Sequence, residues 1–300
     1  MTTPFLADEV SSALHDGRAI VALESTLLSH GLPPGRNLEV ALRLEQVVRD
    51  AGAVPATIAV LDGRPLVGLS RAELERVCAP GAGLDKLSLR DLGPAIGLGR
   101  SGATTVASTA SLAAAAGIGV FATGGLGGVH LNASATWDVS ADLGVLSRVP
   151  TLIVCSGVKS VLDIAATLEV LETNSVPVLG YRTDDFPAFY LRSSGLRVPW
   201  RVENPAQAAA VLAAHRERSD SGVLLANPIP VESEMDRELH DRLLADGLEL
   251  LRTRDVHGSD VTPVLLEHFH SASGGVSLDA NEALVLSNAR LAAEVAVELS

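Results

Sequence analysis

The chain has 300 residues, of which 47% are hydrophobic and 20% charged, a balance that excludes a disordered chain and allows a large buried core. Its net charge of −13 excludes a general binder of nucleic acid polymers or membrane surfaces, and its two cysteines, Cys78 and Cys155, exclude a disulfide framework. The first residues, MTTPFLADEVSSALHDGR, contain no long apolar run, so no membrane anchor is predicted and the protein is expected to be cytoplasmic.

Short β-branched apolar runs alternate with helical patterns along the chain, which is typical of an α/β protein. The predicted strands are residues 19–23, 57–61, 118–122, 151–155, 176–179 and 222–225. The predicted helices are residues 5–15, 37–51, 71–77, 105–116, 160–173, 205–218, 234–251 and 278–299. With no linker or repeat, these elements predict a single domain over residues 1–300. Its expected architecture is a three-layer α/β/α sandwich with a large, mostly parallel central sheet.

Polar residues follow three of the predicted strands. Strand 19–23 leads into Glu24, strand 118–122 into the glycine-rich segment TGGLGGVH, and strand 151–155 into a segment that ends at Lys159. The carboxyl ends of parallel strands share one edge of a sheet, where ligands bind, so these groups are expected at one site. The alternatives are that Glu24 caps a helix or pairs with an arginine, and that the glycines form a tight turn.

Lys86 and Lys159 are the only lysines among 23 basic residues. Arginine stays protonated in proteins, whereas lysine can lose its proton and attack a carbonyl, so both lysines are candidate nucleophiles. Lys159 is expected at the start of the predicted helix 160–173, where the positive end of the helix favours the neutral amine. The alternative is a lysine in a surface salt bridge.

Residues 92–137 contain no Asp or Glu, although the chain has 36 acidic residues. Such a segment suits an anion, and the predicted helix that starts near Thr105 and Val106 offers free backbone amides to a phosphate group. The alternative is a buried apolar segment, since TTVASTASLAAAAGIGVFA is a core sequence. Both hold if a buried helix points its first turn at the anion.

Two aspartates lie in the segment WDVSADL. Ser140-Ala141-Asp142 is typical of a helix start, at which Asp142 is predicted to be the cap. Asp138 then projects from the preceding loop, where a carboxylate is able to hold a hard divalent cation, mainly through water.

Ordered segments over roughly residues 19–299 resemble one known family. They include ALESTLLSHGLP, GATTVASTASLA, FATGGLGGVH, WDVSADL, CSGVKSVLDIAATLEVLET and SLDANEALVLSNARLAAEVA. The sequence resembles the pseudouridine-5′-phosphate glycosidases, also called the indigoidine synthase A-like family. The resemblance implies an α/β/α enzyme that cleaves or forms the carbon–carbon glycosidic bond between ribose 5-phosphate and uracil. It also implies a divalent metal, Mn²⁺ (or Mg²⁺), and a homotrimer.

The same resemblance assigns roles to individual positions. It implies Lys159 as the nucleophile, Glu24 as the proton donor and Asp138 as the metal ligand. The phosphate and ribose contacts fall on Lys86, Val106, Ser140, Ala141 and Asp142, with Thr105 beside them, and the nucleobase contacts on His130 and Asn281. Lys86 stays an alternative imine-forming residue.

The residue types suit this chemistry. A carbon leaving group is poorly served by paired carboxylates alone. An open-chain sugar joined to a lysine as an imine provides an electron sink, so a carbon nucleophile can add to C1′ or leave it. Glu24 then moves the proton, and the phosphate contacts hold C1′ near the lysine.

One segment departs from the family pattern. After GGVH the family usually continues with arginine, glycine, alanine and glutamate, where this chain has Leu131, Asn132, Ala133 and Ser134. This loss of charge predicts a roomier pocket for an aromatic aglycone. It favours the family's C-ribosylating branch, which joins ribose 5-phosphate to polyketide-type aglycones in antibiotic biosynthesis. The alternatives are a pseudouridine-5′-phosphate glycosidase and a non-catalytic sugar-phosphate sensor.

Overall fold

The computed structural model describes residues 4–159, 161–256 and 261–300. The strands in chain order are β1 Phe5–Leu6, β2 Ile20–Leu23, β3 Val54–Leu61, β4 Arg64–Val67, β5 Asp85–Leu87, β6 Gly102–Thr104, β7 Val120–Ala122, β8 Val129–His130, β9 Leu152–Cys155, β10 Leu162–Asp163, β11 Val178–Tyr181, β12 Trp200–Val202 and β13 Val223–Ala226. The α-helices are α1 Asp8–His15, α2 Arg36–Asp50, α3 Arg71–Cys78, α4 Leu89–Gly97, α5 Val106–Ala115, α6 Ala133–Thr136, α7 Ala141–Leu146, α8 Ile164–Thr173, α9 Pro205–Arg216, α10 Arg237–Thr253, α11 Val261–Ala272 and α12 Val276–Glu298. A π-helical turn spans Leu27–Gly31 and a 3₁₀ turn Val231–Ser233.

The described strands form one large sheet and a separate two-stranded antiparallel sheet of β8 and β10. The main path of the sheet is β1-β4-β3-β2-β7-β9-β13-β11-β12, and β6 pairs with β3 and β5 beside it. From β3 to β12 every pair along this path is parallel, whereas β4 and β6 run antiparallel to β3. The six strands predicted from the sequence are the six contiguous central strands of this path. The predicted α/β class and mostly parallel sheet are therefore confirmed.

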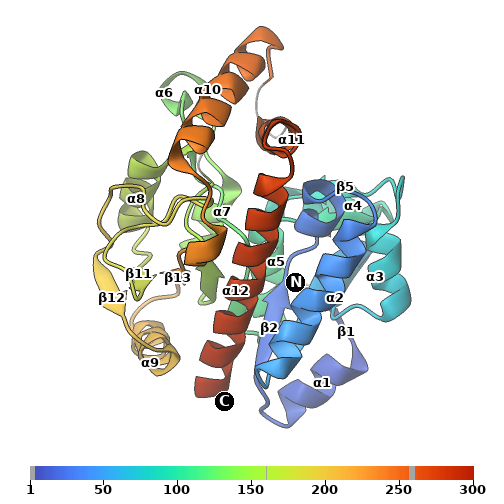
Figure 1. Ribbon diagram of the computed structural model, residues 1–300. Helices are drawn as coiled ribbons and strands as arrows, with labels where there is room; N and C mark the ends of the chain where they lie inside the picture. The colour runs from blue at the N-terminus through green and yellow to red at the C-terminus, as the bar shows by residue number, and fades with distance from the viewer. Residues whose placement is uncertain (1–3, 160, 257–260) are drawn as a thin grey trace.

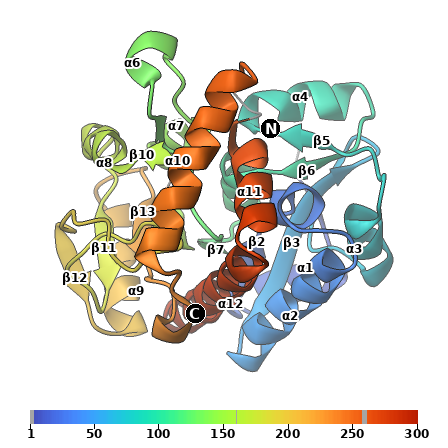
Figure 2. The same ribbon diagram turned by 45° about the horizontal axis from the view of Figure 1, so that its top comes forward.

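Helices cover the sheet on both sides. In Figure 1, α12 and α2 lie in front of the sheet and α5 behind it; α12 contacts β2, β7 and β9, while α5 contacts β2 and β3. Figure 2 shows α10 and α11 crossing one end of the molecule, beyond the carboxyl ends of the strands. Among the described residues, no helix has the length and apolarity that a membrane crossing requires.

Three predicted helices begin at least three residues later than expected. The one predicted over residues 234–251 starts at Arg237, after its cap Asp236, whose side chain accepts from Leu239 N. Residues Phe5–Leu6 pair with β4 as a strand, so the first helix starts at Asp8. In the predicted helix 160–173, Leu162–Asp163 pair with β8, and the Asp163 side chain accepts a hydrogen bond from Ala166 N at 2.9 Å. Helix α8 therefore starts at Ile164, and Ser160 lies outside the described residues.

Candidate active site

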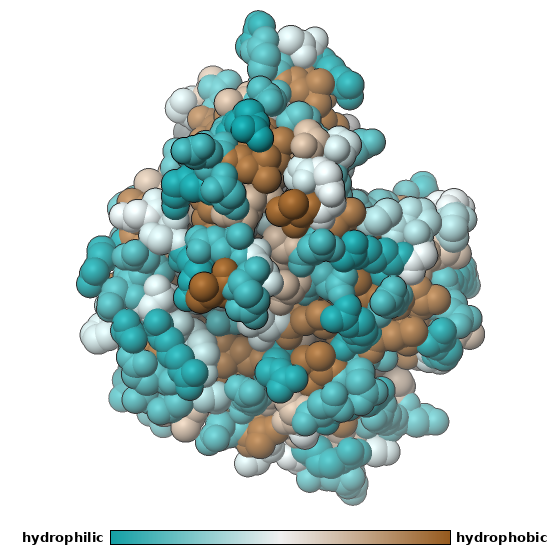
Figure 3. Space-filling model, viewed as in Figure 1, coloured by the Kyte–Doolittle hydropathy of each residue, from teal (hydrophilic) through white to brown (hydrophobic). Residues whose placement is uncertain are grey.

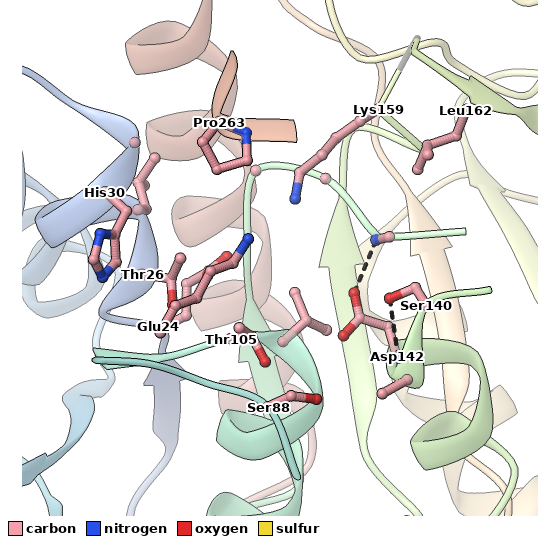
Figure 4. A pocket seen from close by; sticks show the side chains of 18 of the residues that line it. Glu24, Thr26, His30, Ser88, Thr105, Ser140, Asp142, Lys159, Leu162 and Pro263 are labelled. Carbon is pink, nitrogen blue, oxygen red and sulfur yellow. Dashed lines mark hydrogen bonds between the residues drawn. The ribbon is translucent and has the colours of Figure 1, made fainter. Parts of the chain in front are cut away.

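A cavity of about 360 Å³ lies at the carboxyl ends of the parallel strands (Figure 4). It is lined by all eleven site residues predicted from the sequence: Glu24, Lys86, Thr105, Val106, His130, Asp138, Ser140, Ala141, Asp142, Lys159 and Asn281. Helix α11 contributes Pro263 and Leu266 to its wall. On the face seen in Figure 3 the surface is mainly hydrophilic, and its outline is indented between α11 and β5, two elements that both line the cavity. The volume is in the range that small-molecule sites occupy.

The segment after β2 turns one residue into the core and its two neighbours toward the cavity. Ser25 is fully buried; its hydroxyl donates to the Ile58 carbonyl at 2.7 Å and accepts from Thr104 N at 2.9 Å. These bonds fix the backbone between β3 and β6. Glu24 and Thr26 on either side line the cavity.

The Glu24 carboxyl is shaped by burial. Desolvation raises its pKa above the usual value, while the Lys159 ammonium and a hydrogen bond from the Thr123 hydroxyl act in the opposite direction. A carboxyl whose pKa is raised is suited to general acid catalysis.

Lys159 reaches the cavity from a loop rather than from a helix. Its backbone N donates to Leu126 O at 3.3 Å, and Leu126 N donates to Gly157 O at 3.0 Å, which ties this loop to the glycine-rich loop after β7. Gly157 has φ +81°, and a Cβ there would lie 2.0 Å from the Pro187 carbonyl oxygen, so only glycine fits. Because α8 begins at Ile164, the predicted effect of a helix N-terminus on Lys159 is wrong.

Asp142 links the glycine-rich loop to the buried helix α5. Its carboxylate accepts from Gly127 N and from Ala107 N, each at 2.9 Å (Figure 4 shows the first of these bonds). The cap of α7 is Ser140, which accepts from Asp142 N at 3.2 Å, so the prediction that Asp142 is the cap is wrong. Helix α5 is buried and points its first turn at the cavity, as predicted, but one of its amides already has a carboxylate partner.

Asp138 and His130 form the polar wall beside this loop. The Asp138 carboxylate lies 3.5 Å from His130 Nδ1. Burial lowers the pKa of His130, against the opposing effect of Asp138. In the described part of the chain, no group of three or more His, Cys, Asp or Glu side chains is placed to hold a metal ion. These residues fit a hard cation held by Asp138 with water or substrate oxygens as further ligands, and do not fit a cation enclosed by protein groups.

Two polar side chains of the cavity have atoms that are buried without a partner in the described residues. Asn281 is 1% exposed, and neither its Oδ1 nor its Nδ2 has a hydrogen-bond partner. The Thr26 hydroxyl is also buried and has no hydrogen-bond partner in the described residues. Unsatisfied buried polar groups are costly, and their position on a cavity wall points to a ligand that completes them.

Sequence reasoning missed several residues of the site. Thr26 and His30 line the cavity from the segment after β2, and burial and the nearby Lys86 lower the pKa of His30. Phe189 also lines it, with a buried ring and φ +61°, and its backbone N donates to Ser156 O at 2.9 Å. Thr26 and His30 follow a strand end that the sequence had marked, whereas nothing in the sequence near Phe189 signals its position.

The segment that departs from the family pattern lies elsewhere. The described lining of the cavity passes from His130 to Asp138 without residues 131–134. Leu131 is 52% exposed, and α6 has no buried residue. The prediction that these residues enlarge the aglycone pocket therefore lacks support in this chain.

Comparison with known proteins gives relatives over nearly the whole chain. The family of indigoidine synthase A like proteins matches residues 9–298. A protein of Salinispora tropica named pseudouridine-5′-phosphate glycosidase is 55% identical over 291 residues, 96% of this chain and 90% of the relative. One of Streptomyces griseus with the same name is 52% identical over 296 residues, 98% of this chain and 91% of the relative.

Solved structures share the fold. The prealnumycin C-glycosynthase AlnA in complex with ribulose 5-phosphate has a TM-score of 0.91 and 38% identity, over 100% of this chain and 97% of AlnA. An indigoidine synthase A-like protein from Thermotoga maritima has a TM-score of 0.89 and 36% identity, over 100% and 98% of the two chains. Because the family matches residues 9–298 and the named relatives are 52–55% identical over at least 96% of this chain, the chain belongs to the indigoidine synthase A-like family.

Proposed function

We propose that this chain is a pseudouridine-5′-phosphate glycosidase, which cleaves or forms the bond between C1′ of ribose 5-phosphate and a carbon of uracil. The observation that carries this choice is the buried amide of Asn281, which presents an unpartnered donor and acceptor to the cavity. The imide edge of uracil offers a complementary acceptor and donor. The relatives at 52–55% identity that bear this name support the same substrate.

C-ribosylation of a polyketide-type aromatic aglycone is the second candidate. The likeness to AlnA at a TM-score of 0.91 supports it, although AlnA is less similar in sequence than the named glycosidases. Its other support, the uncharged segment 131–134, lies outside the cavity lining. The carbonyl oxygens of a quinone ring only accept hydrogen bonds, so a donor to the Asn281 Oδ1 would have to come from a ring hydroxyl, whereas the imide edge of uracil carries both groups itself.

Lys159 and Glu24 perform the bond cleavage in this proposal. The Lys159 amine attacks C1′, the C1′–O4′ bond breaks, and the Glu24 carboxyl gives its proton to O4′. The Glu24 carboxylate then takes a proton from the Lys159 nitrogen. The C1′–uracil bond breaks with its electron pair on the uracil carbon, which receives that proton from Glu24, and an iminium remains between Lys159 and C1′. Water adds to this iminium and releases open-chain ribose 5-phosphate and the lysine.

The sugar phosphate is bound by other residues of the cavity. Lys86 and the first turn of α5 supply positive charge and backbone amides for the phosphate, in a cavity where Asp142 holds α5 against the glycine-rich loop. Asp138 is the residue that would hold Mn²⁺, which when bound adds positive charge beside the substrate. The homotrimer stays a prediction, which light scattering tests.

Turnover of pseudouridine 5′-phosphate with Mn²⁺ tests the proposal, with uracil release measured by chromatography. The expected result is uracil release, and synthesis from uracil and ribose 5-phosphate in reverse. Reduction of the ribose 5-phosphate complex with borohydride should leave a mass adduct on the Lys159 peptide. An adduct on Lys86 would exchange the roles of the two lysines. No turnover at high enzyme concentration, together with coupling of ribose 5-phosphate to an aromatic quinone, would favour the second candidate.

A further inference from the structure

We propose that Asn288 is a positioning residue that ties the loop carrying the partner of Glu24 to the loop carrying Lys159. The inference rests on the proposed function for its catalytic meaning. The linkage of the two loops by one side chain of α12 does not depend on which substrate the protein binds.

The Asn288 side chain lies behind the cavity wall. It is fully buried, and its Nδ2 donates to Thr123 O at 2.9 Å and to Gly124 O at 3.4 Å. The same nitrogen lies 3.1 Å from Ser156 Oγ. Since carbonyl oxygens only accept, the NH₂ group must face the loop after β7, which fixes the orientation of the amide.

A second asparagine holds the amide from the other side. Asn227, directly after β13, donates from Nδ2 to Asn288 Oδ1 at 3.0 Å, and its backbone N donates to Cys155 O at 2.8 Å. Asn227 Nδ2 also lies 3.1 Å from the hydroxyl of Ser287, the neighbour of Asn288 on α12, and among the residues that the structure describes no side-chain hydrogen bond joins Ser287 to either loop. The ends of β7, β9 and β13 therefore meet on one side chain of α12.

Each loop carries a group of the proposed reaction. Thr123 donates its hydroxyl to the Glu24 carboxyl, so a shift of its backbone moves that hydrogen bond. Ser156 begins the loop that ends at Lys159, and its backbone N donates to Gly124 O at 2.9 Å. Asn288 thus acts on the proton donor through Thr123 and on the nucleophile through Ser156, without touching the substrate.

Asn288→Ala and Ser287→Ala form a matched pair to test this role. Asn288→Ala frees both loops, whereas Ser287→Ala removes a partner of Asn227 and leaves the hydrogen bonds of Asn288 to both loops in place. We expect Asn288→Ala to lower kcat by about 100-fold, because a displacement of about 1 Å at reacting groups has this effect. KM for the sugar phosphate should stay within about threefold, because Asn288 bonds to the start of the glycine-rich loop at Thr123 and Gly124, whereas the first turn of α5 is tied to that loop further along, through Gly127 and Asp142. Ser287→Ala should keep both constants within about twofold. The alkaline limb of the rate profile should also move in Asn288→Ala, because the bond to Glu24 is altered.

Hydrogen–deuterium exchange of the ligand-free protein provides the readout that needs no substrate. Peptides that span residues 123–128 and 156–159 should exchange faster in Asn288→Ala than in wild type, and remain unchanged in Ser287→Ala. If Asn288→Ala fails to fold, Asn227→Ala, which leaves the Asn288 amide unanchored, should give the same pattern at smaller amplitude.

The inference and the proposed function fail in different ways. Wild-type protein that turns over no pseudouridine 5′-phosphate refutes the function, while the exchange data still decide the linkage. Equal exchange in Asn288→Ala and wild type, or a loss of kcat in Ser287→Ala as large as in Asn288→Ala, overturns the inference. So does a rise in KM with kcat unchanged.

Discussion

Two asparagines lie seven residues apart on α12, and both are buried, but only one of them has hydrogen-bond partners in the part of the chain that the structure describes. Asn281 is 1% exposed and has no hydrogen-bond partner in the described residues, whereas Asn288 is fully buried and bonds to two loops and to Asn227. An amide buried without partners costs free energy, and one with partners on every side stabilises the fold. The difference separates the two sides of the cavity wall: Asn281 lines the cavity, and Asn288 bonds to the protein behind it.

The same division runs through the segment after β2. Ser25 is satisfied by the backbone of two strands, while Glu24 beside it is a buried carboxyl that faces Lys159 across the cavity. Cavity-lining groups such as Glu24 and Asn281 therefore lower the stability of the fold. Ser25 and Asn288, which bond to the protein behind the cavity wall, raise it. Replacing a polar group that lines the cavity should therefore lower activity and leave stability equal or higher. Replacing a polar group behind the wall with an apolar one should lower stability.

Lys159→Met gives the largest expected loss of activity on the ligand side. Without an amine, no imine forms, and we expect kcat/KM to fall by about 10⁴-fold or more. The melting temperature should stay close to that of wild type, because the side chain lies in the cavity. Uracil release and calorimetry measure the two quantities. A variant that keeps more than a tenth of the activity would move the nucleophile to Lys86.

Glu24→Gln should lower kcat/KM by about 10³-fold, within the range found for general acids, and raise stability at alkaline pH. Burial raises the pKa of Glu24, so the folded chain keeps a proton that the unfolded chain has lost. The stability linked to this group is complete below the ordinary glutamate pKa and is lost as pH rises through the folded value. The melting temperature of the variant should therefore exceed that of wild type at pH 8 and match it more closely at pH 4. A lower melting temperature at pH 8 would contradict the burial of an uncompensated carboxyl.

Leucine at the two asparagine positions tests the comparison directly. Asn281→Leu removes an unpartnered amide, so we expect the free energy of unfolding to rise by about 1 kcal/mol while kcat/KM for pseudouridine 5′-phosphate falls about 100-fold. Asn288→Leu leaves carbonyl oxygens of both loops unpaired and should lower the free energy of unfolding by about 3 kcal/mol. Urea denaturation measures both. A loss of stability in Asn281→Leu would show that its amide has a structural partner after all.

The cavity-lining residues could be predicted from the sequence better than the contacts behind the cavity wall. The central strands were predictable because each is an apolar run buried on both faces, and Glu24 and Lys159 because they follow such runs. The short strands at the sheet's edges, such as β1 and β12, depend on pairing partners and carry no local pattern. The contacts behind the wall were not predictable: Thr123 meets Glu24 across 99 residues, and Asn288 meets Thr123 across 165. Periodicity placed Lys159 at a helix start, but pairing of Leu162–Asp163 with β8 delays that helix.

Thr123→Val should have a smaller effect, because it removes only the hydrogen bond from the Thr123 hydroxyl to the Glu24 carboxyl. The Thr123 hydrogen bond lowers the pKa of Glu24, so its removal raises that pKa further. A proton donor with a higher pKa stays protonated to higher pH, and the alkaline limb of kcat/KM should move upward in pH. We expect kcat to fall about tenfold, since one hydrogen bond near the reacting groups is lost. Rate profiles of wild type, Thr123→Val and Thr123→Ser measure the shift. Thr123→Ser should restore the wild-type profile, and a limb that moves downward would contradict the assigned bond.

The smallest expected effect comes from the segment after His130. The double substitution Leu131→Arg and Ser134→Glu restores the charges usual in the family, and both positions lie outside the described lining of the cavity. Exposed substitutions away from a site change little, so kcat/KM for pseudouridine 5′-phosphate should stay within about twofold of wild type. A tenfold gain would show that this segment reaches the aglycone, in the chain alone or across a subunit contact. Its uncharged sequence would then again favour an aromatic aglycone over uracil, and the Asn281 amide would lose its place as the group that selects the substrate.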